Sequence, residues 1–220
     1  MTKGQKIKAI LFDLDGTLRD SRSAINPAFE HALKVHNIQV EGDDLHEYIH
    51  SLRAVHGAFA GDLPYEKLRD TYDEKLFELL HTIVLYEHAR EVLKDLKGRG
   101  YKLGLVSSSR FAREAVEQDD LAKFFDVIIS GLDTNNHKPH PEPVHMALKR
   151  LKISPNQSVM VGDLAADIQS GKDAGTTATV AVTHGFGSRK ALERAGADHI
   201  IDSLAELPGI IDIIEQNDGS

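Results

Sequence analysis

Two aspartates follow the first apolar segment of the chain at a spacing suited to acid–base chemistry. Asp13 and Asp15 lie in the sequence Asp-Leu-Asp-Gly-Thr, residues 13–17. In extended backbone, side chains two positions apart point to the same side, so one carboxylate can act as a nucleophile while the other transfers protons. Asp and Gly are also common turn residues. The five-residue pattern is expected by chance only about 0.006 times in such a chain, which favours the catalytic interpretation.

A second acidic pair follows another apolar segment. Asp163 comes directly after residues 158–162, and Asp167 lies about one helical turn further on. Acidic residues near a helix N-terminus are favourable by themselves, by about 0.3–1 kcal/mol, so this pair alone leaves both interpretations open. Together with Asp13 and Asp15, however, the pair would form an oxygen-rich site for a hard divalent cation. Without a cation these carboxylates would repel one another, so we expect a metal there.

Hydroxyl and ammonium groups suited to a phosphate occur between the two acidic pairs. Ser107 and Ser108 begin a run of serines after residues 101–106, where hydroxyls and backbone N–H groups can hold phosphate oxygens. Serine also favours helix N-caps, so this signal is weak alone. Lys138 stands before a proline in the segment His-Lys-Pro-His-Pro-Glu-Pro, residues 137–143, and could neutralise the charge of an intermediate. An exposed lysine is the more common case.

These side chains need strands that all end at one edge of a sheet. Short apolar segments at 7–12, 101–106, 127–129, 158–161, 178–182 and 199–201 predict strands. Between them, apolar residues at i, i+3, i+4 and i+7 predict helices over 87–98 and 143–152. The alternation predicts an α/β fold, a doubly wound parallel sheet with helices on both faces. Such sheets bind ligands at the carboxyl ends of their strands.

Residues 17–85 interrupt this alternation. The segment is predicted to be helical only, with helices at 23–36, 43–52 and 65–81. Since the strand–helix alternation resumes afterwards, we expect a core domain formed by residues 1–16 and 86–220 and an inserted helical domain formed by residues 17–85.

Composition limits the class of protein. The chain has 220 residues, a net charge of −8 and no cysteine. The acidic charge argues against a nucleic-acid groove or a polybasic membrane surface. The lack of cysteine excludes disulfides, thiolate zinc sites and cysteine nucleophiles. With no signal-peptide pattern and no apolar run of about 18 residues, we expect a cytoplasmic protein without a membrane span.

The order and spacing of the four motifs identify a family resemblance. The chain resembles the haloacid dehalogenase superfamily of phosphohydrolases over nearly its full length. Asp13, Ser107, Lys138 and the pair Asp163 and Asp167 match the four motifs of that family in order. The insert is similar to the family's helical C1 cap. Residues 15–21, 138–143 and 161–168 are most similar to the phosphoglycolate phosphatase-like group.

The resemblance implies a mechanism and a metal. Asp13 would attack phosphorus and form an aspartyl-phosphate, and Asp15 would protonate the leaving oxygen and then activate water. Mg²⁺ would be held by Asp13, the backbone carbonyl of Asp15, and Asp163, with support from Asp167. Ser107, Ser108 and Lys138 would bind the phosphoryl oxygens. Asp15 provides the proton shuttle of the phosphatase branch, which the dehalogenase branch lacks.

The substrate implied is a small phosphorylated metabolite, such as phosphoglycolate or a sugar phosphate. In relatives with this cap, the cap contacts the leaving group; Arg53 and His56, in a loop between two expected cap helices, are the candidate contacts here. A solvated arginine at a helix end is an equally good interpretation of Arg53. We expect no nucleic-acid or membrane partner, and a monomer or a homodimer.

Other patterns and functions compete with this interpretation. A phosphosugar mutase shares the same motifs and cap type, and a non-catalytic binding module would be favoured had the motif residues been replaced, which they are not. Residues 46–50 match His-Glu-x-x-His, the zinc protease signature, but lie in the expected cap. His137, His140 and His145 form a histidine-rich stretch interrupted by prolines. Leu164 stands where relatives commonly have Ser or Thr.

Overall fold

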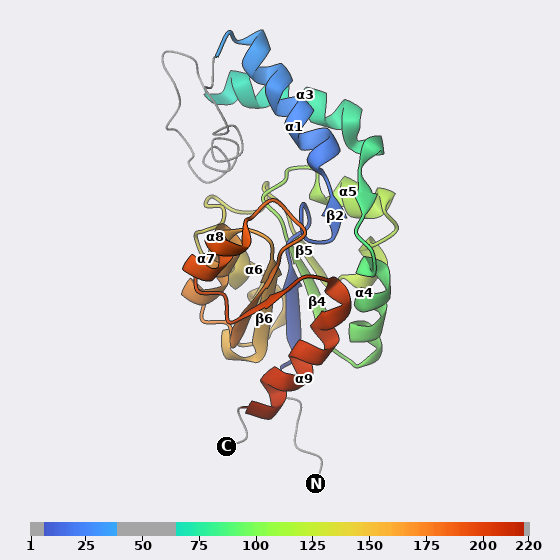
Figure 1. Cartoon of the computed structure of the whole chain (residues 1–220), viewed down its shortest axis with the longest axis vertical. Coiled ribbons are helices and arrows are strands. Elements are labelled where there is room, and N and C mark those ends of the chain that lie inside the picture. Colours follow the sequence, from blue (N-terminus) through green and yellow to red (C-terminus); the bar gives the residue numbers. More distant parts are fainter. Residues whose placement is uncertain (1–6, 39–64, 218–220) are drawn as a thin grey trace. The chain divides into compact units, whose positions relative to one another are not determined.

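The computed structural model describes residues 7–38 and 65–217. The chain divides into two compact units, Met1–Arg19 with Leu85–Ser220, and Asp20–Val84. The first unit contains a six-stranded sheet in the order β5-β4-β1-β6-β7-β8, and every neighbouring pair of strands is parallel (Figure 1). Its strands are β1 (Ala9–Phe12), β4 (Lys102–Val106), β5 (Val127–Ile129), β6 (Ser158–Gly162), β7 (Ala178–Val182) and β8 (His199–Ile201).

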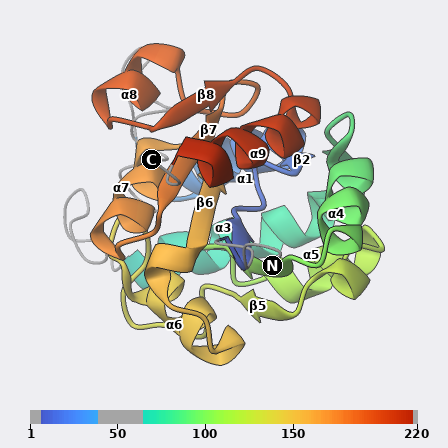
Figure 2. The ribbon, with the colours of Figure 1, turned by 90° about the horizontal axis from the view of Figure 1, so that it is seen from below.

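Helices cover both faces of this sheet. Figure 2 shows α4, α5 and α9 on one side of the strands and α6, α7 and α8 on the other. Side chains of β1 alternate between the two cores: Ile10 and Phe12 pack with the first group, while Ala9 and Leu11 pack on the opposite face. The helices of this unit are α4 (Ala89–Gly98), α5 (Ala112–Gln118), α6 (Glu142–Leu151), α7 (Ala165–Asp173), α8 (Arg189–Arg194) and α9 (Leu207–Asn217), with short 3-10 turns η3 (Ala122–Phe124), η4 (Pro155–Gln157) and η5 (Leu204–Glu206).

The predicted α/β fold and its doubly wound parallel sheet are confirmed. All six predicted strands are present, three with the predicted bounds and three with one end shifted by one or two residues. The chain runs outward from β1 in both directions, through β4 and β5 on one side and through β6, β7 and β8 on the other. The strand order therefore reverses at β1, which is where open α/β sheets bind ligands.

The second unit contains two long helices, α1 (Arg22–Val35) and α3 (Tyr65–Leu79), and α3 is followed by the 3-10 turn η2 (Leu80–Thr82). Both helices lie where helices were predicted. The expected helix at 43–52 lies outside the described residues. The helices pack through small and apolar side chains, and Phe29 and Tyr72 meet edge to face with ring centroids 6.0 Å apart.

One feature of the insert differs from the prediction. Residues 17–85 are not helical only, because β2 (Arg19–Asp20) and β3 (Val84–Leu85) form a two-stranded sheet. Strands of two residues carry no periodicity that a sequence could reveal. The divisions between the two units fall inside these strands.

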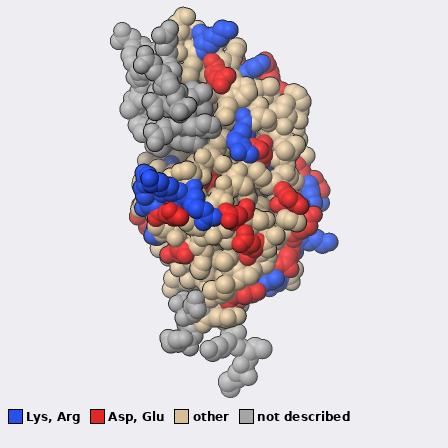
Figure 3. All heavy atoms as spheres, viewed as in Figure 1, with Lys and Arg blue, Asp and Glu red and all other residues tan. Residues whose placement is uncertain are grey.

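The described surface carries side chains of both charges. On the face shown in Figure 3, acidic side chains lie beside basic ones over the described residues. Among the helices of the described ranges, none combines the length and the apolar character needed to cross a bilayer.

Candidate active site

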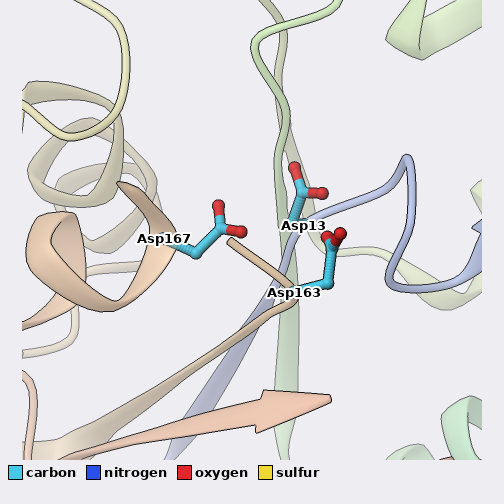
Figure 4. A group of neighbouring side chains, drawn as sticks. All are labelled: Asp13, Asp163 and Asp167. Atoms are coloured by element: carbon cyan, nitrogen blue, oxygen red, sulfur yellow. The ribbon is translucent and has the colours of Figure 1, made fainter. Parts of the chain in front are cut away.

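Three aspartates converge at the carboxyl ends of β1 and β6. Asp13 follows β1, Asp163 follows β6, and Asp167 lies in the first turn of α7. One carboxylate oxygen from each lies within 4.8 Å of the others, and Figure 4 shows the three groups directed toward one another. All three side chains are buried. Asp13 and Asp163, 150 residues apart in sequence, thus meet because β1 and β6 are neighbouring strands, with Phe12 beside Val161.

Lys138 joins this cluster from the segment before α6. Its ammonium Nζ lies 2.5 Å from Asp13 Oδ1 and 2.5 Å from Asp167 Oδ1. Only 6% of the Lys138 side chain is exposed, which excludes the alternative of a solvated lysine. A buried ammonium is stable only when it is paired, and here two carboxylates pair with it.

The cluster carries more negative charge than Lys138 neutralises. Burial raises the pKa of Asp13 to about 7, against the opposing effect of Lys138. Burial, together with the nearby Asp13 and Asp167 carboxylates, raises the pKa of Asp163 well above its usual range. Burial disfavours the Lys138 ammonium, but attraction to Asp13 and Asp167 outweighs it and raises the pKa of Lys138. Three carboxylates around one cation suit the oxygen coordination that divalent metals prefer, so these residues fit a metal site.

Asp163 is fixed in place by two donors. The Thr17 hydroxyl donates to Oδ1 at 2.9 Å, and the backbone N–H of Phe186 donates to Oδ2 at 2.8 Å. Two glycines make room for this carboxylate. A Cβ on Gly16, whose φ is +90°, or on Gly185 would lie 2.3 Å from Asp163 Oδ2. Any larger residue at either position would displace the carboxylate.

Asp167 binds both the start of α7 and the Lys138 ammonium. Its Oδ2 accepts a hydrogen bond from the backbone N–H of Leu164 at 2.9 Å, while its Oδ1 contacts Lys138. Leu164 has no side-chain acceptor for the first N–H groups of α7, but the Asp167 carboxylate still satisfies the N–H of Leu164 itself. The leucine at position 164, where relatives commonly have Ser or Thr, therefore leaves the acidic cluster intact.

Asp15 and the serines lie at the same edge of the sheet. Asp15 is buried, and its Oδ1 accepts a hydrogen bond from Arg19 Nε at 2.8 Å. Ser107 follows β4, the other neighbour of β1, and is 4% exposed. Its Oγ accepts a hydrogen bond from the N–H of Ser109 at 3.1 Å, which turns the chain at the strand end. Ser108 is half-buried in the same turn.

The segment that carries Lys138 is anchored on both sides. Asp133 accepts hydrogen bonds from the Ser130 N–H at 2.8 Å and from Arg113 at 2.7 Å, and Arg150 donates to its other oxygen at 3.2 Å. Although burial opposes it, these bonds lower the pKa of Asp133 to about 2. On the other side of Lys138, the Glu142 carboxylate accepts the N–H groups of residues 135 and 136.

We expect Asp133→Asn to destabilise the fold in a pH-dependent way. Because the folded pKa is below the unfolded value, the Asp133 carboxylate stabilises the folded state above about pH 4, and this contribution is lost as pH falls through about 2. Its partners are partly exposed, so we expect a loss of about 1 kcal/mol at pH 7 and about half of that at pH 3. Urea unfolding at both pH values measures it. Asp95→Asn, which alters an exposed pair with Arg99, is the control; an Asp133→Asn loss of equal size at both pH values would contradict the assignment.

The remaining sequence candidates fall into two groups. Arg53, His56 and the His-Glu-x-x-His segment at 46–50 lie outside the described residues. His140 Nδ1 accepts the Glu142 N–H at 3.1 Å, and His145 Nε2 is 3.2 Å from the Ala174 carbonyl. Over residues 7–38 and 65–217, Asp13, Asp163 and Asp167 form the one group of three or more potential ligands able to hold a metal, so these histidines take no part in such a group there.

Three contributors to the site were missed by sequence reasoning. Thr17 is part of the first motif, and its pairing with Asp163 could have been inferred only from the neighbouring strands. Phe186 acts through its backbone N–H, which no side-chain pattern reveals. Arg19 contacts Asp15 across a turn whose closure depends on the backbone of Gly16.

Comparison with known proteins agrees with this geometry. The family described as haloacid dehalogenase-like hydrolase matches residues 10–182, a range that contains every motif residue named above. The chain belongs to the haloacid dehalogenase-like hydrolases. The resemblance predicted from the motifs is therefore confirmed, and the protein is an enzyme, a hydrolase of this family.

Relatives of this haloacid dehalogenase-like hydrolase are phosphatases. The chain is 35% identical to pyrophosphatase PpaX of Bacillus mycoides over 94% of this chain and 97% of the relative. It is 33% identical to a phosphoglycolate phosphatase of Salmonella typhimurium over 94% and 93% of the two chains. A solved structure of a haloacid dehalogenase-like hydrolase from Bacteroides fragilis superposes with a TM-score of 0.81 at 28% identity, covering 91% of this chain and 99% of the other.

Proposed function

We propose that this hydrolase is a Mg²⁺-dependent phosphatase that releases phosphate from a small organic phosphate monoester through an aspartyl-phosphate on Asp13. The observation that carries the proposal is the buried cluster of Asp13, Asp163 and Asp167 with Lys138 paired to two of them. A nucleophile beside a cation and a metal-binding carboxylate pair is the arrangement that a dianionic phosphate needs, because the attacking carboxylate would otherwise repel it.

The chain's own residues would divide the reaction into two steps. An Asp13 carboxylate oxygen bonds to phosphorus as the bond to the leaving oxygen breaks, and the Asp15 carboxyl gives its proton to that oxygen. Asp15 then takes a proton from water, whose oxygen attacks phosphorus and frees Asp13. Lys138 balances charge on the phosphoryl oxygens, and Ser107 and Ser108 donate to them. Mg²⁺ would be held by Asp13, the Asp15 carbonyl and Asp163, with support from Asp167, and would supply electrostatic stabilisation of the phosphoryl charge.

The substrate class is proposed from the relatives' names. One relative is named a phosphoglycolate phosphatase and another a pyrophosphatase, so a small phosphorylated metabolite and inorganic pyrophosphate are the two classes to compare. The inserted unit would act as the cap that contacts the leaving group, with Arg53 and His56 as its candidate contacts. A phosphosugar mutase remains the second candidate, because it would use the same nucleophile and proton shuttle.

A substrate panel tests the proposed function. Phosphate release is measured with Mg²⁺ from phosphoglycolate, hexose phosphates, glycerol phosphate, pyrophosphate and para-nitrophenyl phosphate. Release from small monoesters supports the proposal. Turnover of pyrophosphate alone would assign the other relative's activity, and isomerised hexose phosphate without free phosphate would assign a mutase. The absence of turnover on every member would reject a phosphatase.

Replacing the proposed proton shuttle should slow the reaction strongly. We expect Asp15→Asn to lower kcat on the best alkyl phosphate by about 10²–10⁴-fold, the usual range for general acid–base catalysis. Steady-state phosphate release measures this, and the temperature of unfolding is compared with the wild type. A loss below threefold on an alkyl phosphate, whose leaving oxygen needs the proton, would mean that another residue is the acid.

A further inference from the structure

Arg19 is a buried cation next to the proposed active site and has no role in the mechanism described above. It is the first residue of β2, and its residue surface is 2% exposed. Arginine is almost never this buried unless it is paired, since removing a guanidinium from water is costly. Arg19 lies in the first unit with Asp15, so the geometry between them belongs to one compact body.

The backbone brings Arg19 face to face with Asp15. The Gly16 N–H donates to the Arg19 carbonyl at 2.9 Å, and the Arg19 N–H donates to the Leu14 carbonyl at 3.2 Å. Asp15 and Arg19 are also paired as an isolated β-bridge. The turn is thus closed by main-chain bonds. Within it, Arg19 Nε donates to Asp15 Oδ1 at 2.8 Å, with side-chain exposures of only 3% and 7%.

A second carboxylate holds the other end of the guanidinium. Arg19 Nη1 lies 3.6 Å from Asp119 Oδ2, an ion-pair distance beyond a good hydrogen bond. Asp119 directly follows α5, and its backbone carbonyl accepts a hydrogen bond from Arg90 at 2.6 Å. Arg19 therefore lies between Asp15, its close partner, and Asp119, a more distant partner whose backbone is held by Arg90.

We propose that Arg19 is a positioning residue for the proton transfers of Asp15. This inference rests on the proposed function. A general acid must come within about 3 Å of the leaving oxygen, and small displacements of a catalytic group cost large factors in rate. A carboxylate on a turn can rotate about its side-chain bonds. The hydrogen bond from Arg19 Nε to Asp15 Oδ1 restricts that rotation, so Asp15 is presented in one orientation. The ion pair with Asp119 keeps the Arg19 guanidinium in place.

Leaving-group dependence separates this role from a structural one. Arg19→Met removes the donor and keeps the side-chain length. We expect kcat/KM for glycerol phosphate to fall about 10–100-fold, while kcat/KM for para-nitrophenyl phosphate, whose leaving group needs no proton, falls less than threefold. Asp15 also activates the water that hydrolyses the aspartyl-phosphate, so in the variant this second step should be slower than the first. The variant should therefore release a burst of about one nitrophenol per active site. Equal losses on both substrates with no burst would overturn the proposal.

A double-mutant cycle and a matched control complete the test. If Arg19 acts through Asp15, adding Arg19→Met to Asp15→Asn should lower kcat/KM for glycerol phosphate less than twofold further. Full additivity would overturn the proposal. Arg90→Met is the control, because Arg90 binds the same Asp119 backbone without contacting Asp15; it should leave the ratio of the two kcat/KM values unchanged.

A conservative variant keeps the proposal testable if Arg19→Met does not fold. Arg19→Lys retains the charge but not the Nε position, and we expect the same selective loss on glycerol phosphate at a smaller size, about 3–10-fold. A folded Arg19→Lys enzyme with wild-type kinetics on both substrates would overturn a positioning role. The wild-type enzyme is assayed alongside: if it hydrolyses neither substrate, the proposed function fails, whereas wild-type turnover without the selective loss rejects only the role of Arg19.

Discussion

Asp13→Asn should abolish phosphate release from every substrate, including those with activated leaving groups. The amide oxygen of asparagine carries no negative charge and cannot form a stable bond to phosphorus, so no aspartyl-phosphate can form. We expect a loss of at least about 10⁴-fold, larger than for Asp15→Asn, because the nucleophile is needed whatever the leaving group. Steady-state release of phosphate and of nitrophenol both measure this, and both should vanish.

The fold should survive this change. Burial raises the pKa of Asp13 to about 7, above its value in an unfolded chain, so ionised Asp13 destabilises the metal-free protein as pH rises from about 4 through 7. A neutral asparagine removes that penalty, while Lys138 keeps its contact with Asp167. In EDTA at pH 8, the variant should therefore unfold at a temperature no lower than the wild type. A folded Asp13→Asn enzyme that retains more than a few per cent of activity would reject the nucleophile assignment.

The sequence predicted the sheet and the acidic cluster because both depend on strong local signals. Each strand is a buried apolar segment, and parallel strands place their carboxyl ends at one edge, which brings Asp13 and Asp163 together once β1 and β6 are neighbours. Which strands are neighbours follows from the family resemblance; the apolar segments alone would not order them. The burial of Lys138 depends on this assembly, and its own surroundings in sequence favoured an exposed side chain.

Other parts of the site depend on contacts that leave no pattern in sequence. The N–H of Phe186 reaches Asp163 from a loop that follows β7, and any residue type could supply that donor. Arg19 and Asp15 are four residues apart, a spacing that suggests a helical pair, yet they meet through a closed turn around Gly16. The short strands β2 and β3 are defined by pairing with each other and not by composition.

Removal of the metal should stop the enzyme reversibly. Asp163 is held by Thr17 and Phe186, and burial beside Asp13 and Asp167 raises its pKa, so the ionised Asp163 carboxylate is destabilised until a metal cation binds it. We expect EDTA to abolish phosphate release and added Mg²⁺ to restore it. Since Mg²⁺ would bind the folded state alone, about 100-fold excess over its Kd should add about 2.7 kcal/mol of stability, a rise in Tm of about 5–10 °C.

Asp163→Asn should remove both effects, because it deletes a metal-binding charge while an amide can still accept the Thr17 hydrogen bond. Thermal unfolding with and without Mg²⁺ gives a readout that does not depend on activity, and phosphate release over a Mg²⁺ titration gives the second. Asp126→Asn is the matched control, since Asp126 pairs with Lys97 and Lys102 at the opposite, amino-terminal end of β4. The control should keep the full Mg²⁺-induced rise in Tm. Full activity in EDTA, or an undiminished rise in Asp163→Asn, would show that the buried aspartates do not form the metal site.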